Sequence, residues 1–320
     1  MKLATFEVET PVGPKRRVGV EDEHGALVDV TTAYAAMLES NGEADPVPVA
    51  EAHAPPEMNA FLSRGERAMN AAKDALEYAR RSDAERGPTG GRLRFEREEV
   101  RLRAPVPRPN SLRDFMAFEE HVRNSLGGDP PDVWYEMPVY YKGNADTVVG
   151  PGDEVPWPDY SEQADYELEI AAVIGKGGEN IDAEEADEYI AGYTILDDFS
   201  ARDIQLEEMA GRLGPAKGKD FASALGPYLV TPDEFDPETA EMTAEVNGET
   251  WSEGVAGEMY HSFADIIEHV SQDEPLHPGD VLGSGTVGEG CGLELGRFLD
   301  AGDTVRLTVE GLGTLENTIR

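Results

Sequence analysis

The chain has one cysteine, Cys291, and no apolar run long enough to cross a bilayer. A single cysteine excludes an internal disulfide and is typical of a reducing compartment. A membrane-spanning helix needs about 20 predominantly apolar residues. The first residues, MKLATFEVETP, alternate like a strand and lack the apolar centre of a signal peptide. We therefore expect a cytoplasmic protein with no membrane partner.

Basic residues are also scarce. The sequence has 27 lysines and arginines against 65 aspartates and glutamates, which gives a net charge of −38. Such a surface repels nucleic acids and anionic membranes, so neither is an expected partner. Like-charge repulsion weakens the fold in dilute salt, whereas the Debye length shrinks to ~3 Å at 1 M salt. Regular hydrophobic periodicity argues against acidic disorder, so we predict a halophilic archaeon as the source.

The beginning of the chain alternates short apolar segments with turns, which predicts a small β-rich domain with helices. The expected elements are strands at 3–8, 17–20 and 26–30, and helices at 32–40 and 57–81. A polar, glycine-rich stretch and then three closely spaced prolines follow. We therefore divide the chain into an N-terminal domain, residues 1–100, and a catalytic domain, residues 101–320.

The remainder of the chain is predominantly β. The expected strands are 99–103, 166–174, 193–196, 227–231, 242–246, 281–282 and 304–309, and the clearest helices are 183–191 and 262–270. Because few helices alternate with these strands, a doubly wound parallel sheet is not expected. We predict an α+β fold that is mostly β.

Two glutamates mark the centre of the second part. Glu167 and Glu169 point to the same side of a strand, because side chains alternate between its faces. Asp198 follows the next apolar run. Converging carboxylates are typical of sites for hard divalent cations. The alternative is a half-buried strand with solvated glutamates, but the apolar neighbours of this pair favour a central strand, where unpaired carboxylates are costly.

Four motifs occur in order after this point. They are DYELEIAAVIGK at 165–176, GYTILDDFSARD at 192–203, Gly218-Lys219-Asp-Phe221 with Gly226-Pro227, and Gly283-Ser-Gly-Thr286. Together they resemble the fumarylacetoacetate hydrolase family over residues 105–320. The resemblance implies a rolled mixed β-sheet, a homodimer, and metal-assisted cleavage or rearrangement of keto acids. It also implies that Glu167, Glu169 and Asp198 are metal ligands.

A possible catalytic pair lies on either side of these motifs. Ser111-Leu-Arg-Asp114 has the pattern of a helix start, and His121 would then lie on the same helix face two turns later. Taken alone, these residues are typical of a helix cap and a structural histidine. In the family, an aspartate seven residues before a histidine is a metal ligand and the histidine is a general base. The resemblance also implies that Glu294 orients His121, and this pair favours hydrolysis.

The remaining expected contacts come from the same resemblance. Tyr141, Gln205 and Thr286 would bind substrate, and Lys219 would stabilise an enolate. Two tyrosines that bind substrate in fumarylacetoacetases are replaced by methionines here, which leaves the substrate open. The G-x-G-x-x-G string at 283–288 lacks a following βαβ unit, so we do not expect a dinucleotide site. Cys291 is interpreted as a structural thiol.

We therefore predict a divalent-metal-dependent hydrolase that cleaves the carbon–carbon bond of a fumarylacetoacetate- or acylpyruvate-like β-diketo acid. Mg²⁺ is the expected ion, with Mn²⁺ or Ca²⁺ as alternatives. Its expected ligands are Asp114, Glu167, Glu169 and Asp198. Three alternatives stay open: a 2-keto-3-deoxy sugar acid dehydratase, a decarboxylase or isomerase of hydroxymuconate-type keto acids, and a catalytically silent metal-binding protein.

Overall fold

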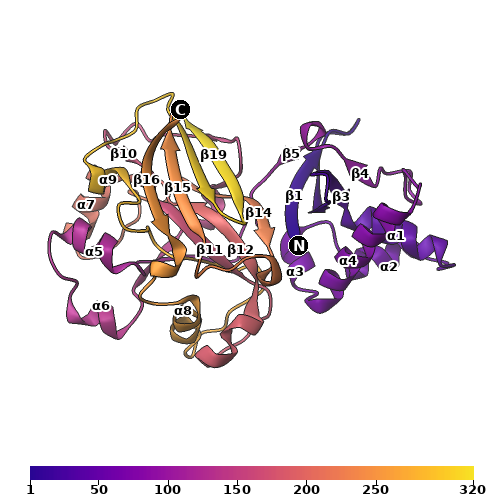
Figure 1. The fold of residues 1–320 in the computed structure, drawn as a ribbon, viewed down its shortest axis with the longest axis horizontal. Coiled ribbons are helices and arrows are strands. Elements are labelled where there is room, and N and C mark those ends of the chain that lie inside the picture. The colour runs from indigo at the N-terminus through magenta and orange to yellow at the C-terminus, as the bar shows by residue number, and fades with distance from the viewer.

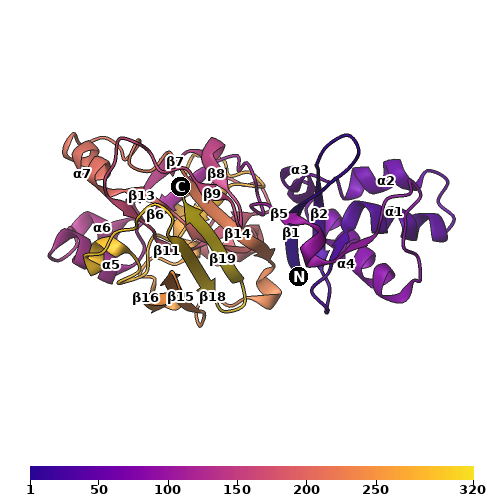
Figure 2. The same cartoon turned by 90° about the horizontal axis from the view of Figure 1, so that it is seen from above.

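The computed structural model describes residues 1–320. An indigo and violet N-terminal lobe lies beside a larger part that runs from magenta to yellow (Figures 1 and 2). One sheet crosses between them, because β1 (Lys2–Val8) pairs with β14 (Ser223–Val230) through Lys2–Val230 and Leu3–Leu229. Buried residues of both parts share one hydrophobic cluster. Residue 100 stays our proposed boundary.

The N-terminal lobe packs helices against a few strands. Its other elements are β2 (Lys15–Glu21), β3 (Leu27–Asp29), α1 (Val30–Ser40), α2 (Pro46–His53), α3 (Met58–Leu62), α4 (Glu66–Arg81), β4 (Arg94–Phe95) and β5 (Arg101–Leu102). Five alanines of α4 are buried at helical spacing, which gives this helix one small, apolar face. The single helix predicted over 57–81 is wrong, because the chain turns between α3 and α4 at Gly65, whose φ of 56° favours glycine.

The large sheet carries the centre of the second part. Its strands run in the order β4-β3-β2-β1-β14-β12-β11-β17-β6-β7. The strands not yet given are β6 (Leu112–Phe115), β7 (Tyr140–Gly143), β8 (Val148–Val149), which pairs with β14, β11 (Leu168–Ile174), β12 (Ile190–Asp197) and β17 (Val281–Gly283). Every residue of β11 and β12 is buried, which explains why both sequences are almost continuously apolar.

A second sheet of five strands packs over this centre. It consists of β9 (Glu154–Val155), β15 (Glu241–Val246), β16 (Glu249–Val255), β18 (Thr304–Val309) and β19 (Gly313–Ile319). A two-stranded sheet joins β10 (Ala164–Asp165) and β13 (Ser200–Ala201). Burial alternates along β18, as expected for a sheet with one face on the core.

Short helices cover the edges of the second part (Figure 1). They are α5 (Glu119–Leu126), α6 (Asp132–Glu136), α7 (Arg202–Ala210), α8 (Phe263–Val270) and α9 (Gly292–Leu295). The 3₁₀ turns are η1 (Arg97–Glu99), η2 (Ala145–Thr147), η3 (Ala183–Tyr189), η4 (Pro232–Glu234) and η5 (Ala256–Glu258). The fold is thus mixed α+β and mostly β, as predicted. No helix combines the length and apolar character that crossing a membrane requires.

Two local predictions in this part are wrong. The segment that begins at Ser111 is the strand β6, because it pairs in parallel with β17 and antiparallel with β7. Asp114 therefore lies on a strand, and His121 lies on the separate helix α5. The helix predicted over 183–191 is the 3₁₀ turn η3.

Candidate active site

Three buried carboxylates converge where β6, β11 and β17 meet. Glu169 is on β11, Glu167 directly precedes this strand, and Asp114 is on β6. One oxygen from each of the three lies within 4.8 Å of the others. The sequence predicted this convergence for the two glutamates from strand alternation alone.

The cluster is short of compensating hydrogen bonds. Asp114 Oδ1 and Glu169 Oε2 are buried and have no hydrogen-bond partner. Burial raises the pKa of both carboxyls well above their usual range. Neighbouring carboxylates raise the pKa of Glu169 further, whereas for Asp114 the repulsion from Asp198 is partly offset by Lys219 and by a hydrogen bond with Glu169. Thr286 Oγ1 donates a hydrogen bond to the other oxygen of Glu169, at 3.2 Å. Two oxygens therefore have no donor from other side chains or the backbone, and only a proton shared between Asp114 and Glu169 would bridge these two carboxyls.

The negative charge of Glu167, unlike those of Asp114 and Glu169, is balanced by two cations in direct contact. Its Oε2 lies 2.5 Å from Lys219 Nζ and its Oε1 lies 2.8 Å from Arg202 Nη2. Burial would raise the pKa of Glu167, but these two cations lower it to about 2. Lys219 is itself buried, and the carboxylates around it hold its pKa above the usual value. It is therefore a charged donor next to the carboxylate cluster.

Asp198 is oriented differently from the other three acids. Its Oδ2 accepts hydrogen bonds from Tyr141 Oη at 2.5 Å and from Lys219 Nζ at 2.6 Å. Its Oδ1 accepts from Ser223 Oγ at 3.2 Å. Asp198 thus lies beside the cluster with its oxygens engaged, and it stays a proposed ligand.

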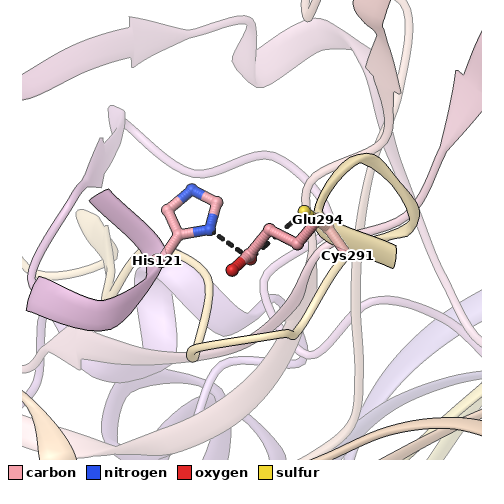
Figure 3. A group of neighbouring side chains, drawn as sticks. All are labelled: His121, Cys291 and Glu294. Carbon is pink, nitrogen blue, oxygen red and sulfur yellow. Dashed lines mark hydrogen bonds and ion pairs between the residues drawn. The ribbon is translucent and has the colours of Figure 1, made fainter. Parts of the chain in front are cut away.

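His121 and Glu294 form the second feature of the site. His121 Nδ1 and Glu294 Oε1 are 2.6 Å apart (Figure 3). Burial acts to raise the pKa of Glu294, but its hydrogen bond with His121 keeps it below the ordinary value. Glu294 Oε2 accepts from Asn124 Nδ2 at 2.7 Å and from the Glu289 amide at 3.0 Å. The hydrogen bonds to Oε2 therefore fix the carboxylate, and the carboxylate in turn holds the imidazole in one orientation.

One cavity of about 290 Å³ joins the two features. Eight of the ten residues predicted for the site line it, and these are Asp114, His121, Tyr141, Glu167, Glu169, Gln205, Lys219 and Thr286. The other two predicted residues, Asp198 and Glu294, contact residues of the lining. Apolar side chains complete the wall, including the two methionines at 116 and 209. The cavity lining thus combines a few charged and polar groups with apolar side chains, as small-molecule sites do.

Sequence reasoning missed two residues that hold the site together. Arg202 Nε donates to Asp165 Oδ2 at 2.7 Å, and both side chains are buried. Asp165 also accepts from the amides of Gly292 and Leu293, at 2.6 and 2.9 Å. Asp165 thereby ties the start of α9, which carries Glu294, to the segment just before β11 that carries Glu167. Asp165 and Arg202 are both part of the motifs given above, so each could have been noticed in the sequence. No local pattern, however, predicts that the two side chains form an ion pair.

The residues present fit a divalent cation. The buried acidic groups include Asp114, Glu167, Glu169 and Asp198, whereas Lys219 and Arg202 are the cations in contact with them. Unpaired buried carboxylates are costly, and an all-oxygen set suits Mg²⁺, Mn²⁺ or Ca²⁺. A bound cation would satisfy the two oxygens that lack partners.

Comparisons with known proteins agree with this architecture. The fumarylacetoacetate (FAA) hydrolase C-terminal family model matches residues 111–320. The chain is 33% identical to human mitochondrial oxaloacetate tautomerase FAHD2A, over 100% of this chain and 91% of that protein. It is 32% identical to oxaloacetate tautomerase YisK of Bacillus subtilis, over 81% of this chain and 84% of that protein. The solved fumarylacetoacetate hydrolase of Exiguobacterium antarcticum superposes with a TM-score of 0.72 at 26% identity, covering 99% of each chain.

The fold and the site define an α+β enzyme with a buried carboxylate cluster beside a histidine–glutamate pair. The chain belongs to the fumarylacetoacetate hydrolase family, as its motifs predicted.

Proposed function

We propose that the protein interconverts the keto and enol forms of a short 2-keto dicarboxylic acid of the oxaloacetate type. The observation that carries this proposal is the His121–Glu294 pair, which borders the same cavity as the carboxylate cluster. Tautomerisation needs one proton moved between carbon and oxygen, and it needs no water. The two oxaloacetate tautomerases that match most of this chain support the same chemistry.

Asp114, Glu167 and Glu169, with Asp198 beside them, would hold the divalent ion. When bound, such an ion polarises a carbonyl oxygen and stabilises enolate charge. Lys219 adds a fixed positive charge on the same side of the cavity. Its contribution is electrostatic, because a preoriented cation in a site of low dielectric stabilises developing negative charge.

His121 would move the proton. Because Glu294 accepts a hydrogen bond from Nδ1, the second ring nitrogen, Nε2, keeps its lone pair. This nitrogen points away from Glu294 (Figure 3). It takes the proton from the carbon between the two carbonyl groups and returns it to the ketone oxygen, and the reverse order gives the keto form. Such general acid–base catalysis contributes about 10² to 10⁴ in rate.

Carbon–carbon hydrolysis of a fumarylacetoacetate- or acylpyruvate-like acid is the second candidate. The observation in its favour is the same His121–Glu294 pair, which could deprotonate a water, together with Lys219 in the lining of the same cavity, where it could stabilise an enolate. The water oxygen bonds to the far carbonyl carbon, the carbon–carbon bond breaks, and its electron pair passes to the enolate, which takes up a proton. The likeness to a solved fumarylacetoacetate hydrolase supports this reading.

Ultraviolet absorbance separates the two functions. Enol-oxaloacetate decay and acylpyruvate loss are measured in Mg²⁺, next to 2-keto-3-deoxy acids and hydroxymuconate-type acids. We expect fast enol decay, reduced by about 10² to 10⁴ in His121→Gln and in Glu294→Gln. His269→Gln, another helix histidine but outside the cavity lining, is the matched control.

The outcomes are distinct. Cleavage of an acylpyruvate without enhanced enol decay would replace the first proposal with the second. Turnover of a dehydratase or decarboxylase substrate that survives both substitutions would contradict both proposals. Because residues that act as a unit are not additive, the double variant should be little worse than the slower single variant.

A further inference from the structure

A third donor lies beside the histidine–glutamate pair. Cys291 Sγ is 3.4 Å from Glu294 Oε1, the same oxygen that contacts His121 (Figure 3). One donor atom from each of the three residues lies within 4.8 Å of the others. Neither the tautomerase nor the hydrolase mechanism uses the thiol.

The surroundings of Glu294 leave its Oε1 facing His121 and Cys291. Its Oε2 is occupied by the Asn124 side chain and by the Glu289 amide. Its Oε1 therefore faces His121 on one side and Cys291 on the other. Cys291 is fixed by the isolated bridge between its backbone and Glu167, and its side chain is fully buried. His121 on α5 and Cys291 in the turn before α9 thus both direct a donor atom at Oε1 of Glu294 on α9.

The spacing is close to that of a tetrahedral transition-metal site. Zinc bonds of about 2.0 to 2.3 Å to nitrogen, oxygen and sulfur place the donor atoms roughly 3.3 to 3.6 Å apart. The sulfur–oxygen distance already has this value, and the nitrogen–oxygen pair at 2.6 Å needs to open by about 1 Å. Of the three residues, His121 borders the cavity, whereas Cys291 is fully buried behind it.

The donor type separates this group from the carboxylate cluster. A thiolate and an imidazole favour zinc and other soft ions, whereas carboxylates favour magnesium, calcium and manganese. Three protein ligands with one open position are also the usual number for a zinc site that keeps an exchangeable ligand. Two groups of different selectivity therefore lie close together, one lining the cavity and the other behind His121.

We propose that His121, Cys291 and Glu294 form an inhibitory site for Zn²⁺ or a similarly soft divalent ion, separate from the carboxylate cluster. This inference goes beyond the proposed function. Binding releases the thiol proton to solvent and forms bonds to sulfur, to the carboxylate and to Nδ1 of the imidazole. The proton of Nδ1 moves to Nε2, so the nitrogen that faces away from Glu294 becomes a donor and no longer accepts a proton. Glu294 is withdrawn from the histidine at the same time, so the base is switched off.

The first test measures binding without substrate. Wild-type protein loaded with Mg²⁺ is titrated with Cd²⁺, and the thiolate-to-cadmium charge-transfer absorption is recorded together with proton release. We expect the absorption to saturate at one equivalent and about one proton to be released, because the coordinating thiol is deprotonated. Cys291→Ser should show no such absorption. His121→Gln keeps the thiol and should show the band only at higher Cd²⁺ concentration.

The second test measures inhibition. With saturating Mg²⁺, Zn²⁺ should inhibit the wild type, and additional Mg²⁺ should not relieve the inhibition. Cys291→Ser should keep its basal activity. It should need at least ~10- to 100-fold more Zn²⁺ for half-inhibition, because loss of even a partner outside the ligand shell lowers metal affinity by that factor. Cys291→Ala provides a second variant if the serine perturbs folding.

Three results would overturn the inference: no cadmium–thiolate band in the wild type, zinc sensitivity as high as that of the wild type in both cysteine variants, or relief of inhibition by Mg²⁺. The last would place zinc at the carboxylates instead. Because the cadmium titration needs no substrate, it decides the inference even if the proposed reaction is wrong.

Discussion

Gly283 lies opposite Asp114 in the parallel pairing of β17 with β6. A Cβ at Gly283 would be 2.4 Å from Asp114 Oδ1 and 2.6 Å from the Leu196 side chain. The absence of a side chain on β17 therefore makes room for the carboxylate on the neighbouring strand. A glycine that resembles part of a nucleotide-binding loop in the sequence is, in the structure, a spacer for the acidic cluster.

Gly283→Ala should displace the Asp114 carboxylate and weaken binding of Mg²⁺ or Mn²⁺, which calorimetry measures directly. Overpacking of this kind costs typically 1–3 kcal/mol, so the melting temperature should also fall. Gly128→Ala is the control, because a Cβ there meets nothing within 4 Å. Wild-type metal affinity in Gly283→Ala would show that Asp114 is not a ligand.

Metal binding should release protons and weaken as pH falls. Asp114 and Glu169 have pKa values raised well above the usual range, chiefly by burial. In the metal-free protein they keep protons that an ordinary carboxyl, with a pKa of about 4, would have lost. A cation needs both ionised, so its affinity rises with pH until the raised pKa values are passed.

The same raised pKa values give the sign of the stability effect. Ionisation of these groups costs more free energy in the metal-free folded protein than in the unfolded chain. The free energy of unfolding is therefore lowered above pH ~4, where the unfolded carboxyls ionise, and is not lowered below that pH. Mg²⁺ should therefore raise the melting temperature more at pH 8 than at pH 5. Glu169→Gln should reduce this difference, whereas Glu253→Gln, on an exposed strand position, should not. Equal Mg²⁺ stabilisation at both pH values would contradict the linkage.

Arg202→Met should be strongly destabilising. Arg202 is buried against Asp165 and Glu167, and removing one partner of a buried ion pair costs about 3–5 kcal/mol because the other charge stays buried. Arg81→Met removes an exposed pair with Glu77 and should cost about 0.5 kcal/mol or less. Urea unfolding of both variants measures the difference. A similar loss in the two would mean that the buried carboxyls become protonated at little cost.

Motifs close together in sequence predicted two members of the carboxylate cluster, Glu167 and Glu169, but gave Asp198 as the third, where the structure brings in Asp114. Strand alternation predicted that Glu167 and Glu169 share a face, and the extended backbone continues far enough before β11 for Glu167 to do so, while their apolar surroundings predicted the central strand. The strand at Leu112–Phe115 was mistaken for a helix start because its pairing partners are distant in sequence. A four-residue cap pattern carries no information about those partners, and tertiary pairing outweighs it.

The contacts between residues far apart in the sequence could not be predicted from local patterns. The contact of His121 with Glu294 joins residues 173 positions apart, and only the family resemblance suggested it. The placement of Asp198 against Tyr141 and Lys219 depends on side-chain rotamers, which no spacing rule gives. The same limit applies to the contact of Cys291 with Glu294, a carboxylate that is itself fixed by two other groups.

The net charge of −38 leads to a prediction about salt. Raising KCl from 0.1 to 1 M shortens the Debye length from about 10 to about 3 Å, which screens repulsion between surface carboxylates. We therefore expect the melting temperature to rise over this range, as a halophilic origin requires. Changing the exposed Glu98, Glu184 and Glu310 to lysine adds two charge units each, from −38 to −32, and should reduce the dependence on salt.

Sulfate salts raise stability by exclusion from the surface in almost any protein, so KCl is the informative salt and potassium sulfate is the comparison. The measurement is calorimetric or by circular dichroism, with Mg²⁺ held constant so that site occupancy does not change. A melting temperature that is equal at 0.1 and 1 M KCl, or a triple lysine variant with the wild-type salt response, would show that surface repulsion does not limit this fold. The acidic composition would then need another explanation than adaptation to salt.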